Sequence, residues 1–191
     1  IATHFGTDNV PNGWSSKTMA VIGIPLLLTA IQLFSAAILF SDPKRQNIGP
    51  KMLRLTLWIT PLLSLIVCCS IYVNAIGIAV DIGFVVNVMV GLLFVFLGNY
   101  LPKCKQNYTT GIKIPWTLHS EENWNRTHRL AGWVWTIGGI VTIVNGFLQL
   151  KWVLFATIAA LIVIPVGYSF FLYQKGILRP KKLLFLSRFL G

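Results

Sequence analysis

The sequence predicts an all-α polytopic membrane protein, a bundle of five transmembrane helices. Three observations support this fold class. Hydrophobic residues make up 55% of the 191 residues and charged residues only 11%, whereas soluble domains carry about 25% charged residues. Apolar stretches of the length that crosses a bilayer recur along the chain. The net charge of +11 is divided among the segments between these stretches, so we expect no direct contact with nucleic acid.

The first half of the chain contains three predicted spans. Residues 1–17 are rich in Gly, Pro, Asn and Ser, and they predict a loop with a turn at Pro11-Asn12-Gly13. The first span covers residues 18–40. A connector, 41–54, leads to a second span at 55–74, which Pro61 should break. The third span covers 82–101 and carries Gly and Asn at helical spacing, which predicts close packing against another helix.

The second half begins with the one long polar passage of the sequence, from Gly98 to Gly132. Ser120 is a candidate N-cap because Glu121 and Glu122 follow it, where the helix dipole favours acids. We expect that helix to continue into a fourth span at 130–150, with a second seam of small residues. A fifth span follows at 152–173. Residues 18–173 then form the transmembrane bundle, residues 102–129 its cytoplasmic loop, and residues 174–191 a basic amphipathic tail.

The cations predict the orientation in the membrane. Of the 16 lysines and arginines, 14 fall in the 41–54 connector, the polar loop and the tail. By the positive-inside rule, the 102–129 loop and the C-terminus face the cytoplasm and residues 1–17 face outward.

An ordered series of residues in the polar passage resembles the signature of the SdpI family of bacterial membrane proteins. The series is Gly98-Asn99, Asn107, Gly111-Ile112-Lys113, Pro115-Trp116-Thr117, Trp124, Thr127-His128 and Gly132. His4-Phe5-Gly6, Gly13 and Lys17 resemble the loop that often precedes the family core. The resemblance implies a protein of the bacterial cytoplasmic membrane that gives immunity to a secreted, membrane-active peptide toxin by binding or sequestering it. It also implies a sixth helix upstream of residue 1 and coupling to a cytoplasmic repressor.

The resemblance identifies two groups of candidate binding residues. The family-motif positions expected to bind a ligand or partner are Asn99, Asn107, Gly111, Lys113, Pro115, Trp116, Thr117, Trp124, Arg126 and His128. The outer-loop candidates for contact with the toxin are His4, Phe5 and Trp14. An alternative for the outer loop is a lid folded back on the bundle.

A second functional class is a membrane enzyme or lipid-handling protein that acts on an anionic headgroup at the cytoplasmic loop. Lys113, Arg126, Asn99 and Asn107 could converge on a phosphate or carboxylate, with His128 nearby. Alternatively, these cations anchor the loop to membrane lipids, at about 1 kcal/mol each. The sequence has no nucleophile elbow and no acid pair within a span, so enzyme activity is the less favoured class. Transport is weaker still, because the spans hold no ion pair.

The metal-binding residue types do not fall into a known pattern. His119 and His128 lack the spacing of a zinc helix, although Glu121 or Glu122 could join them if the loop folded back. The cysteines, Cys68, Cys69 and Cys104, have no ligand spacing either. We therefore predict neither a metal nor a cofactor.

Overall fold

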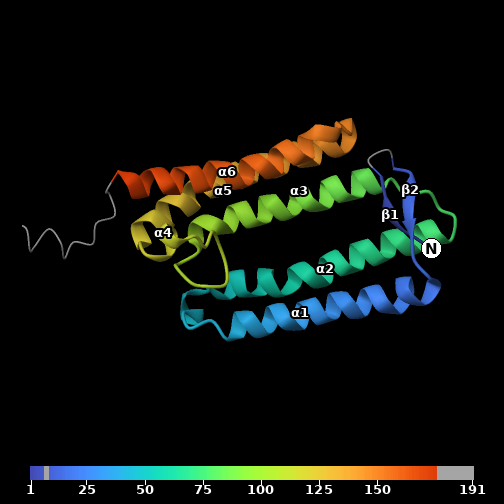
Figure 1. The fold of residues 1–191 in the computed structure, drawn as a ribbon, viewed down its shortest axis with the longest axis horizontal. Coiled ribbons are helices and arrows are strands. Elements are labelled where there is room, and N and C mark those ends of the chain that lie inside the picture. The colour runs from blue at the N-terminus through green and yellow to red at the C-terminus, as the bar shows by residue number, and fades with distance from the viewer. Residues whose placement is uncertain (7–8, 176–191) are drawn as a thin grey trace, which may run out of the picture.

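The computed structural model describes residues 1–6 and 9–175, and its long helices run side by side (Figure 1). The predicted 176–191 part of the tail lies outside the described residues. Within the described ranges, five helices are long and apolar enough to cross a membrane. They are α1 (Ile24–Phe40, continuing a π-helical turn at Met19–Gly23), α2 (Pro50–Ala75), α3 (Ile82–Tyr100), α5 (Glu121–Leu148) and α6 (Lys151–Gln174). The predicted helical membrane fold is confirmed.

The helices form two groups. Helix α5 packs along both α3 and α6, while α1 and α2 pack as a separate pair below them in Figure 1. Between α1 and α2, the Gln32 amide donates to the Leu57 carbonyl at 2.8 Å. The two groups are joined chiefly at their ends, because α2 has few close contacts with α3 along its length.

Small residues bring α3 and α5 together, as their spacing predicts. A Cβ added at Gly98 would lie 2.6 Å from the backbone nitrogen of Thr136, and one added at Gly139 would lie 2.6 Å from the Gly91 carbonyl oxygen. Neither position has room for a side chain. Further along the seam, the Asn145 amide donates to Asn87 Oδ1 at 3.0 Å, so an amide pair satisfies itself inside the bundle.

The helix starts follow local sequence signals. Ser120 Oγ accepts the Asn123 N–H at 3.2 Å, which confirms the predicted N-cap of α5. Helix α2 begins at Pro50, earlier than the predicted Leu55, because proline is well suited to the first helical turn. The predicted break at Pro61 is wrong, since α2 continues through it as one helix.

The prediction of a loop over residues 1–17 is wrong in part. Strands β1 (Ala2–Phe5) and β2 (Pro11–Trp14) pair as an antiparallel hairpin. The predicted turn at Pro11-Asn12-Gly13 is instead part of β2, and the chain reverses before it. Gly13 lies opposite His4, where an added Cβ would come within 2.9 Å of the His4 Cβ. Glycine thus permits the close strand pairing that the sequence pattern did not reveal.

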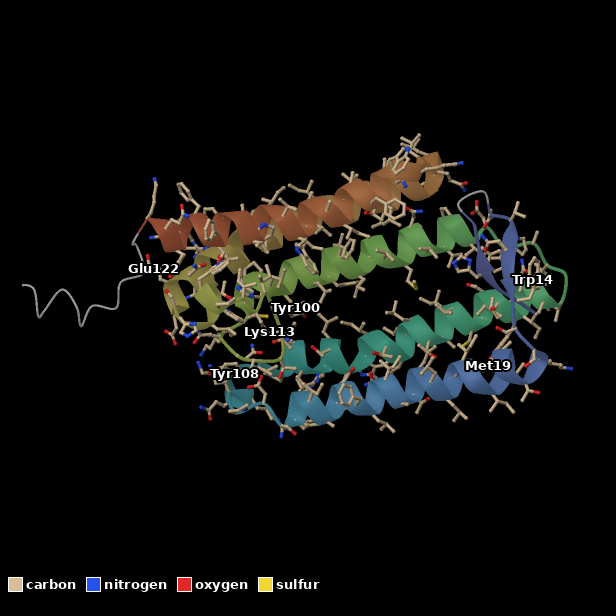
Figure 2. All side chains as sticks on the ribbon, viewed as in Figure 1. Trp14, Met19, Tyr100, Tyr108, Lys113 and Glu122 are labelled. Carbon is tan, nitrogen blue, oxygen red and sulfur yellow. The ribbon has the colours of Figure 1, made fainter. Side chains whose placement is uncertain are left out.

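The hairpin folds back onto the bundle, which agrees with the alternative of a lid. The side-chain oxygen of Asn9 accepts the backbone N–H groups of Ile82 (2.9 Å) and Gly83 (3.3 Å) at the start of α3. Trp14 remains 68% exposed at this end of the molecule (Figure 2).

Candidate functional site

The polar passage between α3 and α5 folds into a compact structure, which we call the polar cap (residues 104–128). It includes the short helix α4 (Pro115–Leu118) and the first two turns of α5. Trp124 is fully buried at its centre, and its indole N–H donates to the Cys104 carbonyl at 2.7 Å. The His128 ring stacks on Trp124 with ring centroids 4.0 Å apart. Trp124 and His128, one helical turn apart on α5, therefore share an interior face.

Both ring nitrogens of His128 are used inside the protein. Nε2 accepts the backbone N–H of Ile112 at 2.9 Å, which requires this nitrogen to be unprotonated. Nδ1 therefore carries the proton and donates to the Trp124 carbonyl at 2.7 Å. In this neutral form His128, which is 1% exposed, has no nitrogen left for a metal or for proton transfer.

Gly111 fits directly against this histidine. Its φ of +101° is strongly disfavoured for any residue with a Cβ, and an added Cβ would collide with His128 Nε2. The glycine lets the backbone turn closely enough for Ile112 to reach the ring.

Asn107 and Thr117 hold the remaining turns of the cap. Asn107 Oδ1 accepts the backbone N–H groups of Thr109 (2.9 Å) and Thr110 (2.6 Å). The Thr117 hydroxyl donates to the Ile112 carbonyl at 2.8 Å and accepts the Ile114 N–H at 3.1 Å. Both side chains are buried, so these two motif residues shape the cap.

Asp42, which the sequence analysis did not single out, joins the cap to the α1–α2 pair. Its carboxylate accepts hydrogen bonds from the Thr109 hydroxyl (2.6 Å) and from the backbone N–H groups of Tyr108 (3.0 Å) and Lys44 (2.7 Å). Burial alone would raise the pKa of Asp42, but these hydrogen bonds together lower the pKa below its ordinary value. Residues more than sixty positions apart are thus joined by one ionised carboxylate.

The Asp42 bridge predicts an acid-sensitive joint. Since the pKa of Asp42 is lowered in the folded state, its contribution to stability is present above the unfolded value of about 3.9 and is lost as the pH falls below it. Asp42→Ala should destabilise the protein by about 2 kcal/mol at pH 7. Thermal unfolding in detergent between pH 3 and 7 should show that the difference in melting temperature between parent and variant becomes smaller towards pH 3. A difference that does not change with pH would contradict the bridge.

The predicted convergence of Asn99, Lys113, Arg126 and His128 on one anion is not seen. Lys113 is exposed and its ammonium donates to the Thr109 carbonyl at 2.8 Å. Exposed Arg126 pairs with Glu122 at 2.7 Å. Asn99 accepts from Lys103 at 3.3 Å, and His128 is buried. Figure 2 shows Lys113 at the end of the bundle opposite Trp14.

Two motif residues attach the cap to α6. The Trp116 ring stacks on Tyr173 with centroids 5.9 Å apart and lies 5.4 Å from the Phe170 ring. Neighbouring Pro115 begins α4 and is exposed.

A second link between α5 and α6 lies outside the predicted residues. Buried Asn123 donates to the Ser169 carbonyl at 3.0 Å and accepts the Ser169 hydroxyl at 2.6 Å. Its position one residue before Trp124, on the buried side of α5, is the only sequence signal for this role.

Arg126 also lines a surface hollow beside the lipid-facing part of α5. Arg129, Trp133 and Tyr168 line it too, and its volume is about 610 Å³. Cations beside aromatic rings at a helix end suit the headgroup region of a bilayer, which fits the membrane-lipid contact expected from the sequence.

The metal-binding residue types stay apart in the described part of the chain. There, no three His, Cys, Asp or Glu side chains come together in a group able to hold a metal ion. His119 is exposed and its Nδ1 lies 2.5 Å from the Pro115 carbonyl, away from the buried His128 ring.

Comparison with known proteins finds one family similarity and one distant relative. The model of the SdpI/YfhL protein family matches residues 103–169. Over 176 residues the chain is 22% identical to the immunity protein SdpI of Bacillus subtilis (strain 168), across 88% of this chain and 82% of that protein. The chain therefore resembles the SdpI/YfhL family over residues 103–169 and, more distantly, the immunity protein SdpI over most of its length. No solved structure matches it significantly.

The part matched by the SdpI/YfhL family model is the polar cap with α5 and most of α6. It contains the motif from Asn107 to Gly132, whereas Gly98-Asn99 and the hairpin lie outside it. In this structure the matched segment is the one that folds the cap onto the bundle.

Proposed function

We propose that this protein gives immunity against a secreted, membrane-active peptide toxin, and that it does so by binding or sequestering the toxin at the bacterial cytoplasmic membrane. The observation that carries the proposal is the alignment with the immunity protein SdpI, which extends over nearly the whole chain. A similarity of that length extends well beyond the cap into the membrane spans.

The geometry of the cap favours binding over catalysis. Its buried Asn107, Thr117 and Trp124 side chains make internal hydrogen bonds, and the two ring nitrogens of His128 are both occupied. The two cations of the expected headgroup site bind separate partners: Lys113 donates to the Thr109 carbonyl, and Arg126 pairs with Glu122. A protein that acts by sequestration needs a stable shape in the membrane, and the hydrogen-bonded cap contributes to one.

The orientation is part of the same proposal. The cap lies at the end of the bundle that carries most cations, so the positive-inside rule puts it in the cytoplasm and the hairpin outside. The hairpin's candidate residues His4 and Trp14 are exposed, in a position where a toxin arriving from outside would meet them.

Coupling to a cytoplasmic repressor would use the exposed surface of the cap. Lys113, Arg126 and Arg129 are exposed on a rigid support, and such cations suit a partner with an acidic face. This role is separable from toxin binding, because the cap and the hairpin lie at opposite ends of the molecule (Figure 1).

Survival of a toxin-sensitive host tests immunity. Cells that express the protein should survive the toxin against which the Bacillus subtilis SdpI gives immunity. Lys113→Ala should protect as well as the parent at equal membrane abundance, because this exposed side chain supports only a surface contact. Death of cells that carry the parent protein would overturn the proposal. Loss of protection by Lys113→Ala alone would favour a working site on the cap.

A further inference from the structure

A cavity lies between the hairpin and the helix ends at the proposed outer face. Its volume is about 200 Å³, and its lining comes from the hairpin and from the ends of α3, α5 and α6. The cavity therefore lies where the hairpin rests on the bundle. The hairpin is at the end of the bundle opposite the polar cap (Figure 1).

The walls of the cavity are mainly apolar. Phe5 comes from the hairpin, Val86 from α3, and Leu154 and Phe155 from α6. Sites for small molecules usually measure about 300 Å³ or more, so this cavity is better matched to one or two side chains of a peptide. Phe155 is 60% exposed at its mouth, and its surface is available to an incoming apolar group.

Amides line the cavity beside these walls. Asn87 and Asn145 bond to each other inside the bundle. Gln149 uses its amide nitrogen to bind Asp81. Within residues 1–6 and 9–175 its amide oxygen has no hydrogen-bond partner, so it can accept an N–H from a peptide backbone.

Two residues of the lining have an unusual backbone conformation. Within the described ranges, Asn9 (φ 62°) and Gln149 (φ 49°) are the non-glycine residues with positive φ, and both line this cavity. Gln149 is the C-cap of α5, close to where helices commonly use glycine because it adopts this conformation without a steric penalty. A strained side chain retained where glycine would be more favourable suggests a function for that side chain.

Exposed tryptophans lie on the hairpin and at the start of α6, the elements that contribute walls to the cavity. Trp14 on the hairpin is 68% exposed and Trp152 at the start of α6 is 81% exposed, as expected at the boundary between membrane and water. A membrane-active peptide concentrates its apolar side chains at that same boundary.

We propose that this cavity is the toxin-recognition site, and that it takes an apolar side chain of the peptide against Phe155 while Gln149 binds the adjoining peptide backbone. The inference rests on the proposed immunity function and adds to it the place and chemistry of recognition. It also gives the hairpin a role as one wall of the binding site.

Binding to the purified protein in lipid nanodiscs tests this site. The probe is a fluorescent form of the toxin against which the Bacillus subtilis SdpI gives immunity. Phe155→Ala should weaken binding about tenfold or more. Phe171→Ala is the matched control, because it changes the same residue type on the same helix at a 50% exposed position near the other end, and it should leave binding unchanged.

Gln149→Gly separates recognition from folding. Glycine relieves the left-handed backbone, so the melting temperature should equal or exceed that of the parent while binding weakens several-fold. Parent-level binding by both Phe155→Ala and Gln149→Gly would overturn the cavity assignment and leave immunity intact. Absence of binding and of protection by the parent protein would overturn both.

Discussion

Replacing Gly98 with leucine is expected to separate α3 from α5 and to destabilise the protein by about 3 kcal/mol or more. The added side chain would begin 2.6 Å from the Thr136 nitrogen and 2.9 Å from the Gly132 carbonyl oxygen. These are backbone atoms of a long helix, which cannot turn aside as a flexible side chain can. The helices would have to move apart, and the Asn87–Asn145 hydrogen bond further along the seam would be strained with them.

Gly167→Leu provides the matched control for Gly98→Leu. An added Cβ at Gly167, on an exposed position of α6, meets no atom within 4 Å. The same chemical change on another membrane-spanning helix, at an open position, should therefore leave stability unchanged or slightly raised. Thermal unfolding in detergent, followed by loss of the monodisperse peak in size-exclusion chromatography, compares the two. Equal melting temperatures for both leucine variants would contradict close packing of α3 on α5.

Replacing His128 with alanine should destabilise the polar cap by about 3 to 5 kcal/mol. The change leaves the Ile112 N–H unpaired, removes the donor to the Trp124 carbonyl and opens a cavity beside the Trp124 ring. Loss of toxin protection by this variant would thus reflect misfolding and would not by itself indicate catalysis.

His119→Ala is the matched control for His128→Ala. It removes the same residue type from the same cap at an exposed position, and it should change stability by less than about 0.5 kcal/mol. A double-mutant cycle sharpens the comparison. Gly111→Ala collides with the His128 ring, so in the absence of that ring its cost should fall by roughly 0.5–3 kcal/mol. Strict additivity of the two changes would mean that Gly111 and His128 do not contact each other.

The sequence was informative wherever a short-range signal decides the structure. Apolar length placed the five spans, Ser120 with its two following acids placed the start of α5, and the spacing of small residues identified the faces that meet at Gly91 and Gly139. Each of these depends on neighbours within one or two helical turns. The hairpin was missed because its strands are only four residues long, with Pro and Gly where a strand pattern would have apolar residues.

The candidate site was harder to predict, because the partners of its residues are distant or belong to the backbone. Asp42 meets Tyr108 and Thr109 after an intervening chain of more than sixty residues. His128 was a candidate for chemistry because no residue near it in the sequence indicates that the Ile112 N–H donates to its Nε2. Much of the family motif, from Asn107 to His128, falls within the cap. What it could not show is that Asn107, Thr117, Trp124 and His128 point inward.

The hydrogen bonds between the α1–α2 connector and the cap can form only late in synthesis of the chain. Asp42 and Asn47 leave the ribosome about sixty residues before their partners, Thr109 and Gln106. At 5–20 residues per second, that is a delay of roughly 3 to 12 s. During this interval α1 and α2 can insert into the membrane as a helix pair. The connector between them then carries a carboxylate and an amide that lack their final hydrogen bonds. The α1–α2 pair is therefore joined to the rest of the protein only when these hydrogen bonds form. Until then its connector remains accessible to membrane chaperones and proteases.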